Sequence, residues 1–73
     1  MSNIHTETLR FIHQRNLEGF KPIFSDICKK QKFTKPTCKK VIDALVQNKL
    51  LIVEKKGRMK HLIVTETGIK FSH

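Results

Sequence analysis

Two short apolar runs, LLIV at residues 50–53 and LIV at residues 62–64, flank a cationic segment that has Gly57 and Arg58 at its centre. Runs rich in β-branched residues around a glycine are typical of a β-hairpin. A two-residue loop of Gly57 and Arg58 suits a type II′ turn, because that turn needs a positive φ at its first position. The sequence therefore predicts a hairpin over about residues 50–65, in which apolar side chains face one another across the strands. The cross-strand pairs of this register are Leu51 with Val64, Ile52 with Ile63, Val53 with Leu62, and Glu54 with His61.

The chain before the hairpin has the three- to four-residue apolar spacing that is typical of helices. A first helix is expected over about residues 3–16, and Ser2 or Asn3 can cap its start. Its apolar surface is large for a helix with one solvated side, so we expect part of it to form a two-fold interface in a homodimer. The residues of that surface are Ile4, Leu9, Phe11 and Ile12.

Two further helices are predicted between residues 25 and 48. The side chain of Ser25 can cap the start of the shorter one, which ends near Lys30. Thr34 can cap the longer one, over about residues 35–48, and a proline in its first turn breaks no helical hydrogen bond. Two helices joined by a turn of about four residues have the spacing of a helix-turn-helix motif.

The chain is strongly basic: its 73 residues include 15 Lys and Arg against 6 Asp and Glu, for a formal net charge of +9. So large an imbalance is self-repelling unless a polyanion neutralises it, so nucleic acid is the first expected partner and an anionic membrane surface the second. The length suits a single domain, residues 1–73. No apolar run is long enough to span a membrane, and the N-terminal segment lacks the apolar core of a signal peptide. Because nucleic acid is favoured over a membrane surface, we expect a cytoplasmic protein without a membrane partner.

The cysteines, histidines and acidic residues do not have the spacing that catalysis or metal binding requires. Cys28 and Cys38 form no Cys-x-x-Cys motif and have no histidine at ligand spacing, so neither a metal nor a cofactor is expected. We expect both to be small core residues where the second and third helices meet, with a disulfide within or between chains left open. The acids are scattered and no glycine-rich phosphate loop is present, so neither an enzyme nor a small-molecule ligand is predicted. His61 is expected to pair with Glu54.

The order of three helices and a hairpin, together with several short motifs, resembles a winged helix-turn-helix DNA-binding domain of the MarR/ArsR-like kind, in a minimal form. That pattern has Ser-Glu-Leu-Ala at the start of its second helix, Ser-x-x-Thr-Val at the start of its recognition helix, and Leu-Thr-x-x-Gly after a basic hairpin. The resemblance covers about residues 20–69. It implies an α+β fold of three helices followed by a two-stranded β-hairpin wing, about residues 50–65, and then a tail at 66–73. The matching residues are Ser25, Asp26, Ile27, Cys28, Thr34, Thr37, Cys38, Leu45, Leu50, Leu51, Val64, Thr65 and Gly68.

This sequence departs from the family pattern at two turns and at its end. Gln31 and Lys32 stand where the pattern has an apolar residue followed by glycine, so we expect a looser or longer turn there. Lys49 stands where the recognition helix usually ends in glycine. The sequence ends five residues after Gly68, whereas larger relatives continue into a dimerising helix. We therefore expect any dimer contact to come from the first helix or the wing.

The resemblance implies a sequence-specific protein that binds double-stranded DNA and regulates transcription by occupying an operator. A helix fits the major groove, where base edges carry a full donor and acceptor code, and a cationic wing suits the DNA backbone or the minor groove. The candidate DNA-contacting residues on the third helix are Lys35, Thr37, Lys39, Lys40, Asp43 and Gln47. The candidates on the wing are Lys55, Lys56, Arg58 and Lys60.

Two other functions stay open at this point. A winged helix can bind nucleic acid without sequence preference, as a chromatin- or RNA-binding protein does, and abundant lysine is compatible with that. The same fold can also serve as a protein-interaction module without DNA, because fold does not determine function. A merely solvated lysine face on the third helix is the less favoured interpretation, because the hairpin tip repeats the same charge on a separate element.

Overall fold

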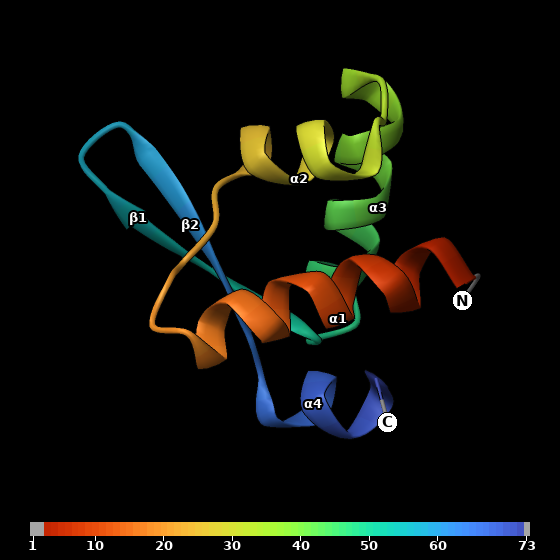
Figure 1. Ribbon diagram of the computed structural model, residues 1–73, viewed down its shortest axis with the longest axis vertical. Coiled ribbons are helices and arrows are strands. Elements are labelled where there is room, and N and C mark those ends of the chain that lie inside the picture. The colour runs from red at the N-terminus through yellow and green to blue at the C-terminus, as the bar shows by residue number, and fades with distance from the viewer. Residues whose placement is uncertain (1–2, 73) are drawn as a thin grey trace.

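Six elements follow one another along residues 3–72, the part of the chain that the computed structural model describes (Figure 1). They are α1 (Asn3–Leu17), α2 (Phe24–Gln31), α3 (Lys35–Gln47), β1 (Leu51–Lys56), β2 (Met59–Val64) and α4 (Glu66–Ser72). The fold is α+β, as expected, with α2 and α3 as a helix-turn-helix pair and β1 and β2 as an antiparallel hairpin. Figure 1 shows α1 between the α2–α3 pair and α4, while the hairpin projects away from the helices. Ser2, one of the two expected caps of α1, lies outside the described residues.

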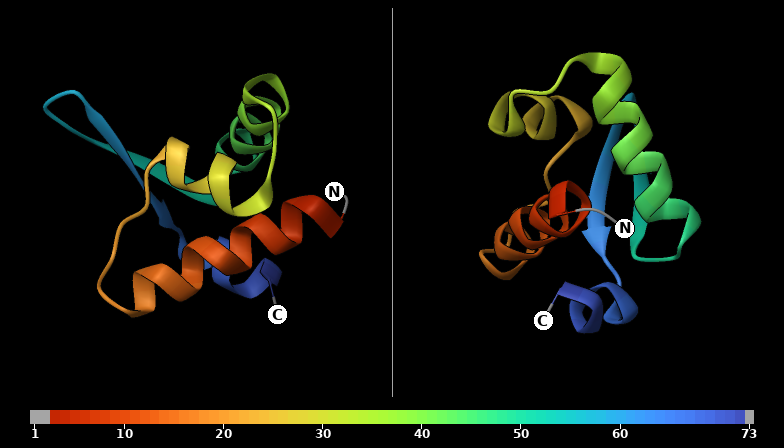
Figure 2. Two further views of the ribbon diagram at one scale, coloured as in Figure 1. Left: turned by 45° about the horizontal axis from the view of Figure 1, so that its top comes forward. Right: turned by 90° about the vertical axis from the view of Figure 1, so that its right-hand side faces the viewer.

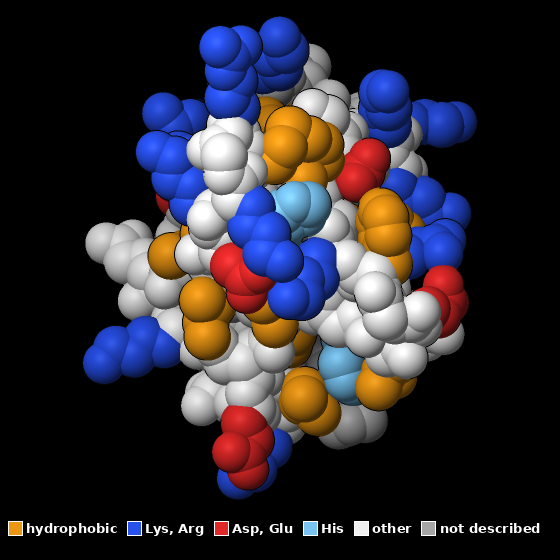
Figure 3. All heavy atoms as spheres, turned by 90° about the vertical axis from the view of Figure 1, so that its left-hand side faces the viewer, with side chains coloured by type: hydrophobic (Ala, Val, Ile, Leu, Met, Phe, Trp, Pro, Cys, Tyr) orange, Lys and Arg blue, Asp and Glu red, His pale blue; other side chains and the backbone are white. Residues whose placement is uncertain are grey.

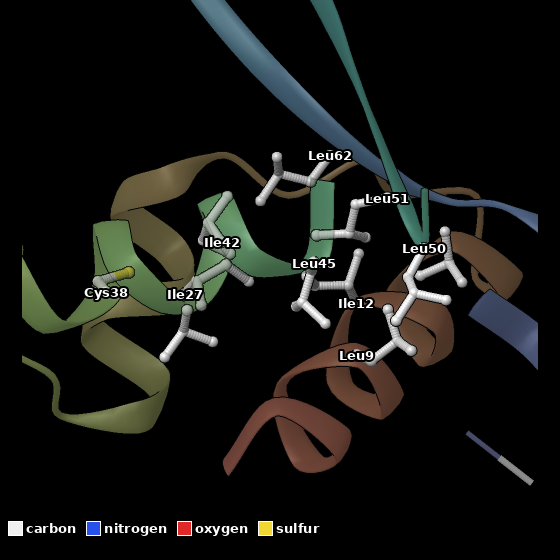
Figure 4. Packing of buried hydrophobic residues seen from close by; sticks show 11 residues of the cluster. Leu9, Ile12, Ile27, Cys38, Ile42, Leu45, Leu50, Leu51 and Leu62 are labelled. Carbon is white, nitrogen blue, oxygen red and sulfur yellow. The ribbon is translucent and has the colours of Figure 1, made fainter. Parts of the chain in front are cut away.

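The hydrophobic core lies where α1, α2 and α3 meet the base of the hairpin. Leu9 and Ile12 of α1, Ile27 of α2 and Leu45 of α3 have no exposed surface. Figure 4 shows their side chains gathered with those from the base of the hairpin. Each of these helices therefore buries one apolar stripe against the others. The cluster is completed by Cys38, Val41, Ile42, Leu50, Leu51, Leu62 and Val64.

Much of the apolar surface of α1, part of which was expected to form a dimer interface, packs within its own chain. Leu9 and Ile12 belong to the core, and Phe11 is half-buried against it. Ile4 is the one exposed member of the predicted set, with 45% of its surface accessible. Leu9 and Ile12 cannot take part in a two-fold interface, because α1 packs against the hairpin and α4 of its own chain. A contact through the exposed part of this surface stays a prediction.

The hairpin has the predicted register, with Val53 opposite Leu62 and Ile52 opposite Ile63. Its loop is formed by Gly57, whose φ is 60°, and a following residue without positive φ, as a type II′ turn requires. Side chains alternate between the two faces of a strand, so the register also divides the hairpin residues into two sets. One face carries Leu51, Val53, Lys55, Lys60, Leu62 and Val64, and the other carries Ile52, Glu54, Lys56, Met59, His61 and Ile63.

A single side chain of α1 fastens the outer edge of the hairpin. The Asn16 amide nitrogen donates to the carbonyls of Phe20 at 3.1 Å and Leu62 at 3.3 Å. The Asn16 amide oxygen accepts from the Val64 N–H at 2.9 Å. Beside it, the Leu62 N–H donates to the Pro22 carbonyl at 2.8 Å. The outer edge of β2 is therefore hydrogen-bonded as well as its inner edge, and the hairpin is held in a fixed position on the helices.

The start of α3 agrees with the sequence prediction, whereas the start of α2 does not. Thr34 caps α3, and its hydroxyl accepts from the Thr37 N–H at 3.4 Å. α2 begins one residue before Ser25, so the prediction that this serine caps α2 is wrong. The cap position is Ile23, whose extended backbone forms a bridge to β2. The carboxylate of Asp26 accepts a hydrogen bond from the Ile23 N–H at 3.1 Å, which is the backward hydrogen bond of a capping box.

Three helices end in the same way, on a residue with left-handed backbone conformation. Gly19 follows α1, Lys32 follows α2 and Lys49 follows α3, with φ values of 82°, 54° and 61°. In each case the next N–H donates back into the last helical turn, as Phe33 does to the Cys28 carbonyl at 3.1 Å. The turn between α2 and α3 is therefore closed, and the expectation of a looser or longer turn is wrong. Lysine simply adopts the conformation that glycine usually supplies.

The segment after the hairpin, expected as a tail, forms the additional helix α4. Thr65 caps this helix: its hydroxyl accepts from the Gly68 N–H at 3.0 Å and donates to the Lys49 carbonyl at 2.7 Å. Gly68 is buried so close to the Leu50 carbonyl that a Cβ atom there would clash with it. α4 packs against α1, and Figure 2 shows the two helices side by side in both views.

Candidate nucleic-acid interface

One side of α3 is buried, and its exposed side carries the DNA-contacting residues predicted for this helix. The buried side consists of Cys38, Val41, Ile42 and Leu45. At 3.6 residues per turn, Lys39, Asp43 and Gln47 follow one another in a row along the opposite side. Thr37 is held near the start of the helix, where its hydroxyl lies 3.0 Å from that of Thr34. The exposed residues of the predicted set are Lys35, Thr37, Lys39, Lys40, Asp43 and Gln47, which is all of them.

The four cations predicted for the wing are all exposed, but they do not share one environment. Lys55 and Lys60 lie directly opposite each other on the hairpin face that is turned toward α3. Lys56 lies on the other face, and Arg58 lies in the loop. Figure 3 views the molecule from the side of the hairpin and shows Lys and Arg side chains spread over this surface.

Lys56 belongs to a small ion-pair network around Glu54. The Glu54 carboxylate lies 3.3 Å from the Lys21 ammonium and 3.5 Å from the Lys56 ammonium. The hydrogen bond and charge of Lys21, with a smaller effect of Lys56, hold the pKa of Glu54 below its usual range. His61 lies opposite Glu54, but the predicted pairing is wrong, because its Nδ1 lies 2.8 Å from the Lys21 carbonyl instead. Lys56 is thus partly neutralised within the chain.

The helix α3 and the hairpin border a cleft of about 490 Å³. Its apolar floor and charged rim are lined by Phe24, Val53, Leu62, Lys39, Asp43, Lys55 and Lys60. Like charges directly opposite on neighbouring strands repel each other, and Lys55 and Lys60 are such a pair. An anion between α3 and the hairpin relieves this repulsion, so the cleft is electrostatically suited to a phosphate group.

Further cations outside the predicted set lie beside the helix-turn-helix. Lys29 and Lys32 border, together with Lys35, a hollow of about 430 Å³ between α2 and the start of α3. Phe33 forms part of its apolar wall. The signal in the sequence is the run KKQK at residues 29–32, because cations at the end of a helix that precedes a recognition helix extend the same charged surface.

The two cysteines lie where α2 meets α3, and both are free thiols. Cys38 is fully buried, as predicted, and Cys28 is half-buried against the core. Burial, followed by the hydrogen bond and charge of Cys28, raises the pKa of Cys38 to about 12. A thiol with so high a pKa stays protonated near neutral pH, so Cys38 is a packing residue rather than a nucleophile.

Within residues 3–72, no group of three or more His, Cys, Asp or Glu side chains is arranged to hold a metal ion. None of the helices in this range is both long enough and apolar enough to cross a membrane.

Comparisons with known proteins bear on the fold. No protein-family model matches the chain, and no curated protein matches it at a significant level. Among solved structures, the chain is similar to MepR, a transcription regulator of the Staphylococcus aureus multidrug efflux pump MepA, with a TM-score of 0.88 and 25% identity. A structure of S. aureus MepR in complex with DNA matches with a TM-score of 0.87 and 24% identity, over 99% of this chain and 54% of that one.

A third similar structure is AF1382 from Archaeoglobus fulgidus, with a TM-score of 0.86 and 22% identity over 99% of this chain and 79% of that one. MepR is a winged-helix regulator of the MarR family, so the fold that the sequence resembled is confirmed. The likeness to MepR covers 99% of this chain but 53% of the MepR chain, so this chain spans about half the length of that regulator.

Proposed function

We propose that this chain binds double-stranded DNA sequence-specifically and regulates transcription by occupying an operator. The observation that carries the proposal is that two cationic elements, α3 and the hairpin, lie on either side of one cleft. B-DNA presents a groove, a ridge of phosphates and another groove in succession. A helix in the major groove and a hairpin beyond the adjacent phosphates match that succession. The similar fold of MepR, whose complex with DNA is known, supports this mode of binding.

In this mode the exposed row of α3 faces the base edges of the major groove. The ammonium of Lys39 can donate to guanine, and the carboxamide of Gln47 can form two hydrogen bonds with adenine. Thr37 is held in place by its contacts with the cap residue Thr34, so it can offer a fixed contact near the start of the helix. These side chains give the interface the means to read sequence, which phosphate contacts alone do not provide.

In the same binding mode, the cleft and the hairpin loop contact the phosphate backbone of the DNA. Lys55 and Lys60 face the cleft, where a phosphate neutralises both, and Arg58 in the loop extends beyond it toward the minor groove. Each phosphate that is neutralised releases counterions, so binding should weaken steeply as salt rises. The Lys29 and Lys32 side chains extend the phosphate-binding surface past the start of α3.

We further propose that the functional unit is a homodimer in the cytoplasm. One recognition helix reads only a few base pairs, and regulators of this kind gain affinity by placing two such helices about 34 Å apart on a pseudo-palindrome. The packed pair α1 and α4 leaves Ile4 and Phe71 exposed, at 45% and 44%. These two residues are the candidates for an apolar contact with a second copy.

Selection of bound sequences from a random duplex pool tests the proposal. An enriched motif, with two related halves if the protein is dimeric, is the expected result. Lys39→Glu should abolish that enrichment, whereas Lys70→Glu, the same charge change on α4, should leave the motif intact. Tight binding without an enriched motif contradicts the proposal in favour of a non-specific nucleic-acid-binding protein. Failure to bind any duplex contradicts it in favour of a protein-interaction module.

A further inference from the structure

Asp43 is an acid at the centre of an otherwise cationic interface. It is the only Asp or Glu of α3, it is exposed, and it lies on the rim of the cleft with Lys39, Lys55 and Lys60. Within residues 3–72, no ion pair or hydrogen bond engages its carboxylate. No direct bond in the described fold therefore explains the position of Asp43, and a carboxylate there opposes the approach of DNA phosphate.

The chemistry of the major groove limits what such a carboxylate can face. A carboxylate only accepts hydrogen bonds, and the groove offers just two donors, the N4 amino group of cytosine and the N6 amino group of adenine. Every other polar group there, and every phosphate, is an acceptor that repels it. A DNA-bound α3 can thus satisfy Asp43 at one of two bases and leaves it unpaired at the others.

The two bases differ in what lies beside the amino group. Adenine places the N7 acceptor next to N6, so a carboxylate that reaches N6 also meets a repelling lone pair. Cytosine has a C–H group beside N4 and no second acceptor on its own edge. We propose, on the premise that α3 enters the major groove as argued above, that Asp43 reads cytosine and is the residue that sets specificity at one C·G pair of the operator.

This assignment also gives Asp43 a role on DNA that lacks the operator. On random sequence its carboxylate meets acceptors at most positions, so it weakens the electrostatic binding that the surrounding lysines favour. A correct base contact of this kind discriminates by roughly 5- to 150-fold. One acid among the lysines thus increases the ratio of specific to non-specific affinity more than an added cation would, because a cation strengthens both.

The test is duplex selection with the whole chain and three variants. The wild type should enrich C·G at one position, Asp43→Ala should show no preference there, and Asp43→Asn should change the preference to A·T, because an amide pairs with both N6 and N7 of adenine. Glu7→Gln removes the same charge from an exposed site on α1 and should retain the wild-type motif. Affinity for random duplex should rise several-fold more in Asp43→Ala than in Glu7→Gln.

The possible failures are distinguishable. If the wild type enriches a motif that Asp43→Ala also enriches at every position, the assignment of Asp43 is overturned while sequence-specific binding stands. If neither the wild type nor Glu7→Gln enriches any motif, the proposed function itself is overturned. Since Asp43 is exposed and makes no bond within the described chain, both Asp43 variants should unfold at the wild-type temperature, which thermal denaturation verifies.

Discussion

Lys32 and Lys49 have the same left-handed backbone conformation as Gly19, which is energetically unfavourable for lysine but not for glycine. For a residue with a Cβ atom, the left-handed region costs roughly 1–2 kcal/mol. Lys32→Gly and Lys49→Gly are therefore each expected to raise the free energy of unfolding by about 1 kcal/mol, measured by urea denaturation. Gly19→Ala, at the matched position after α1, should lower it by a similar amount. An unchanged unfolding free energy in all three variants would show that these positions are not strained.

The same two lysines should differ in their effect on DNA binding. Lys32 borders the hollow beside the start of α3, whereas Lys49 follows the opposite end of that helix. Lys32→Gly should weaken binding to every duplex and reduce the slope of log affinity against log salt by about 0.9. Lys49→Gly should leave both quantities unchanged. Equal losses in the two variants would contradict the placement of the start of α3 against DNA.

Cys38 makes stability depend on pH in the alkaline range. Its pKa is about 12 in the folded chain against an ordinary 9.0, so the folded state keeps a proton that the unfolded state loses. The stabilisation is complete below about pH 9 and is lost as the pH rises toward 12. Relative to Cys38→Ala, the wild type should lose up to about 1.4 kcal/mol per pH unit in that window. Urea denaturation under reducing conditions checks this, and a pH-independent difference between the two proteins would contradict it.

At the scale of elements, Asn16 joins α1 to β2 through its carboxamide. Its removal leaves the Leu62 carbonyl and the Val64 N–H without their partner in a partly buried place. Asn16→Ala should therefore lower the free energy of unfolding by about 2–3 kcal/mol. Gln14→Ala removes only an exposed 3.4 Å hydrogen bond to Glu18 and serves as the control, with an expected change below about 0.5 kcal/mol. A loss no larger than that of the control would show that the hairpin is held by its apolar base alone.

Because side chains alternate between the two faces of β1, two neighbouring lysines should differ in their effect on DNA binding. Lys55 faces the cleft, whereas Lys56 faces away from α3 and lies 3.5 Å from the Glu54 carboxylate. Lys55→Ala should therefore weaken duplex binding and flatten its salt dependence more than Lys56→Ala does. In a Glu54→Gln background, which releases Lys56, the difference between the two should shrink. A larger effect of Lys56→Ala in the unmodified chain would place DNA on the other face of the hairpin.

Local patterns predicted the elements that depend on local interactions. The hairpin register followed from two apolar runs paired across a Gly57-Arg58 loop, and the cap Thr34 lies three residues before its partner N–H. The start of α2 was misplaced because Ile23 is held by a bridge to β2, a contact between segments far apart in sequence. α4 went unnoticed although Thr65 is a normal helix cap, because that threonine matched the motif that follows a wing.

In the candidate interface, too, the features that depend on local sequence were predicted and those that depend on distant contacts were not. The exposed arc of α3 follows from helical periodicity and was predicted in full. The unequal roles of the wing cations were not, because the partner that fixes Glu54 is Lys21, which lies 33 residues away in the sequence. The cleft itself also arises from packing: its apolar floor includes Phe24 of α2 beside the two strands, and no stretch of sequence shows that contact.

For the whole molecule, the hairpin tip lies on the opposite side from the start of α1 and the end of α4 (Figure 1). A chain of 73 residues buries only about 60% of its unfolded surface, and its formal charge of +9 opposes a compact state. DNA on the hairpin side and a second copy on the side where α1 begins and α4 ends would each add buried surface or remove repulsion. The arrangement leaves room for both partners at once.

At the scale of the whole molecule, we predict that the chain forms a homodimer. Sedimentation at tens of micromolar should show twice the 8.5 kDa mass of one chain. Ile4→Arg combined with Phe71→Arg should give the monomer without loss of helix signal, because both side chains are exposed. Leu17→Arg combined with Ile52→Arg alters exposed apolar residues elsewhere and should remain dimeric. On DNA with two half-sites about 34 Å apart, the monomeric variant should lose cooperative binding but keep the base preference of each half-site. A wild type that sediments as one chain and fills the two half-sites independently would refute the dimer.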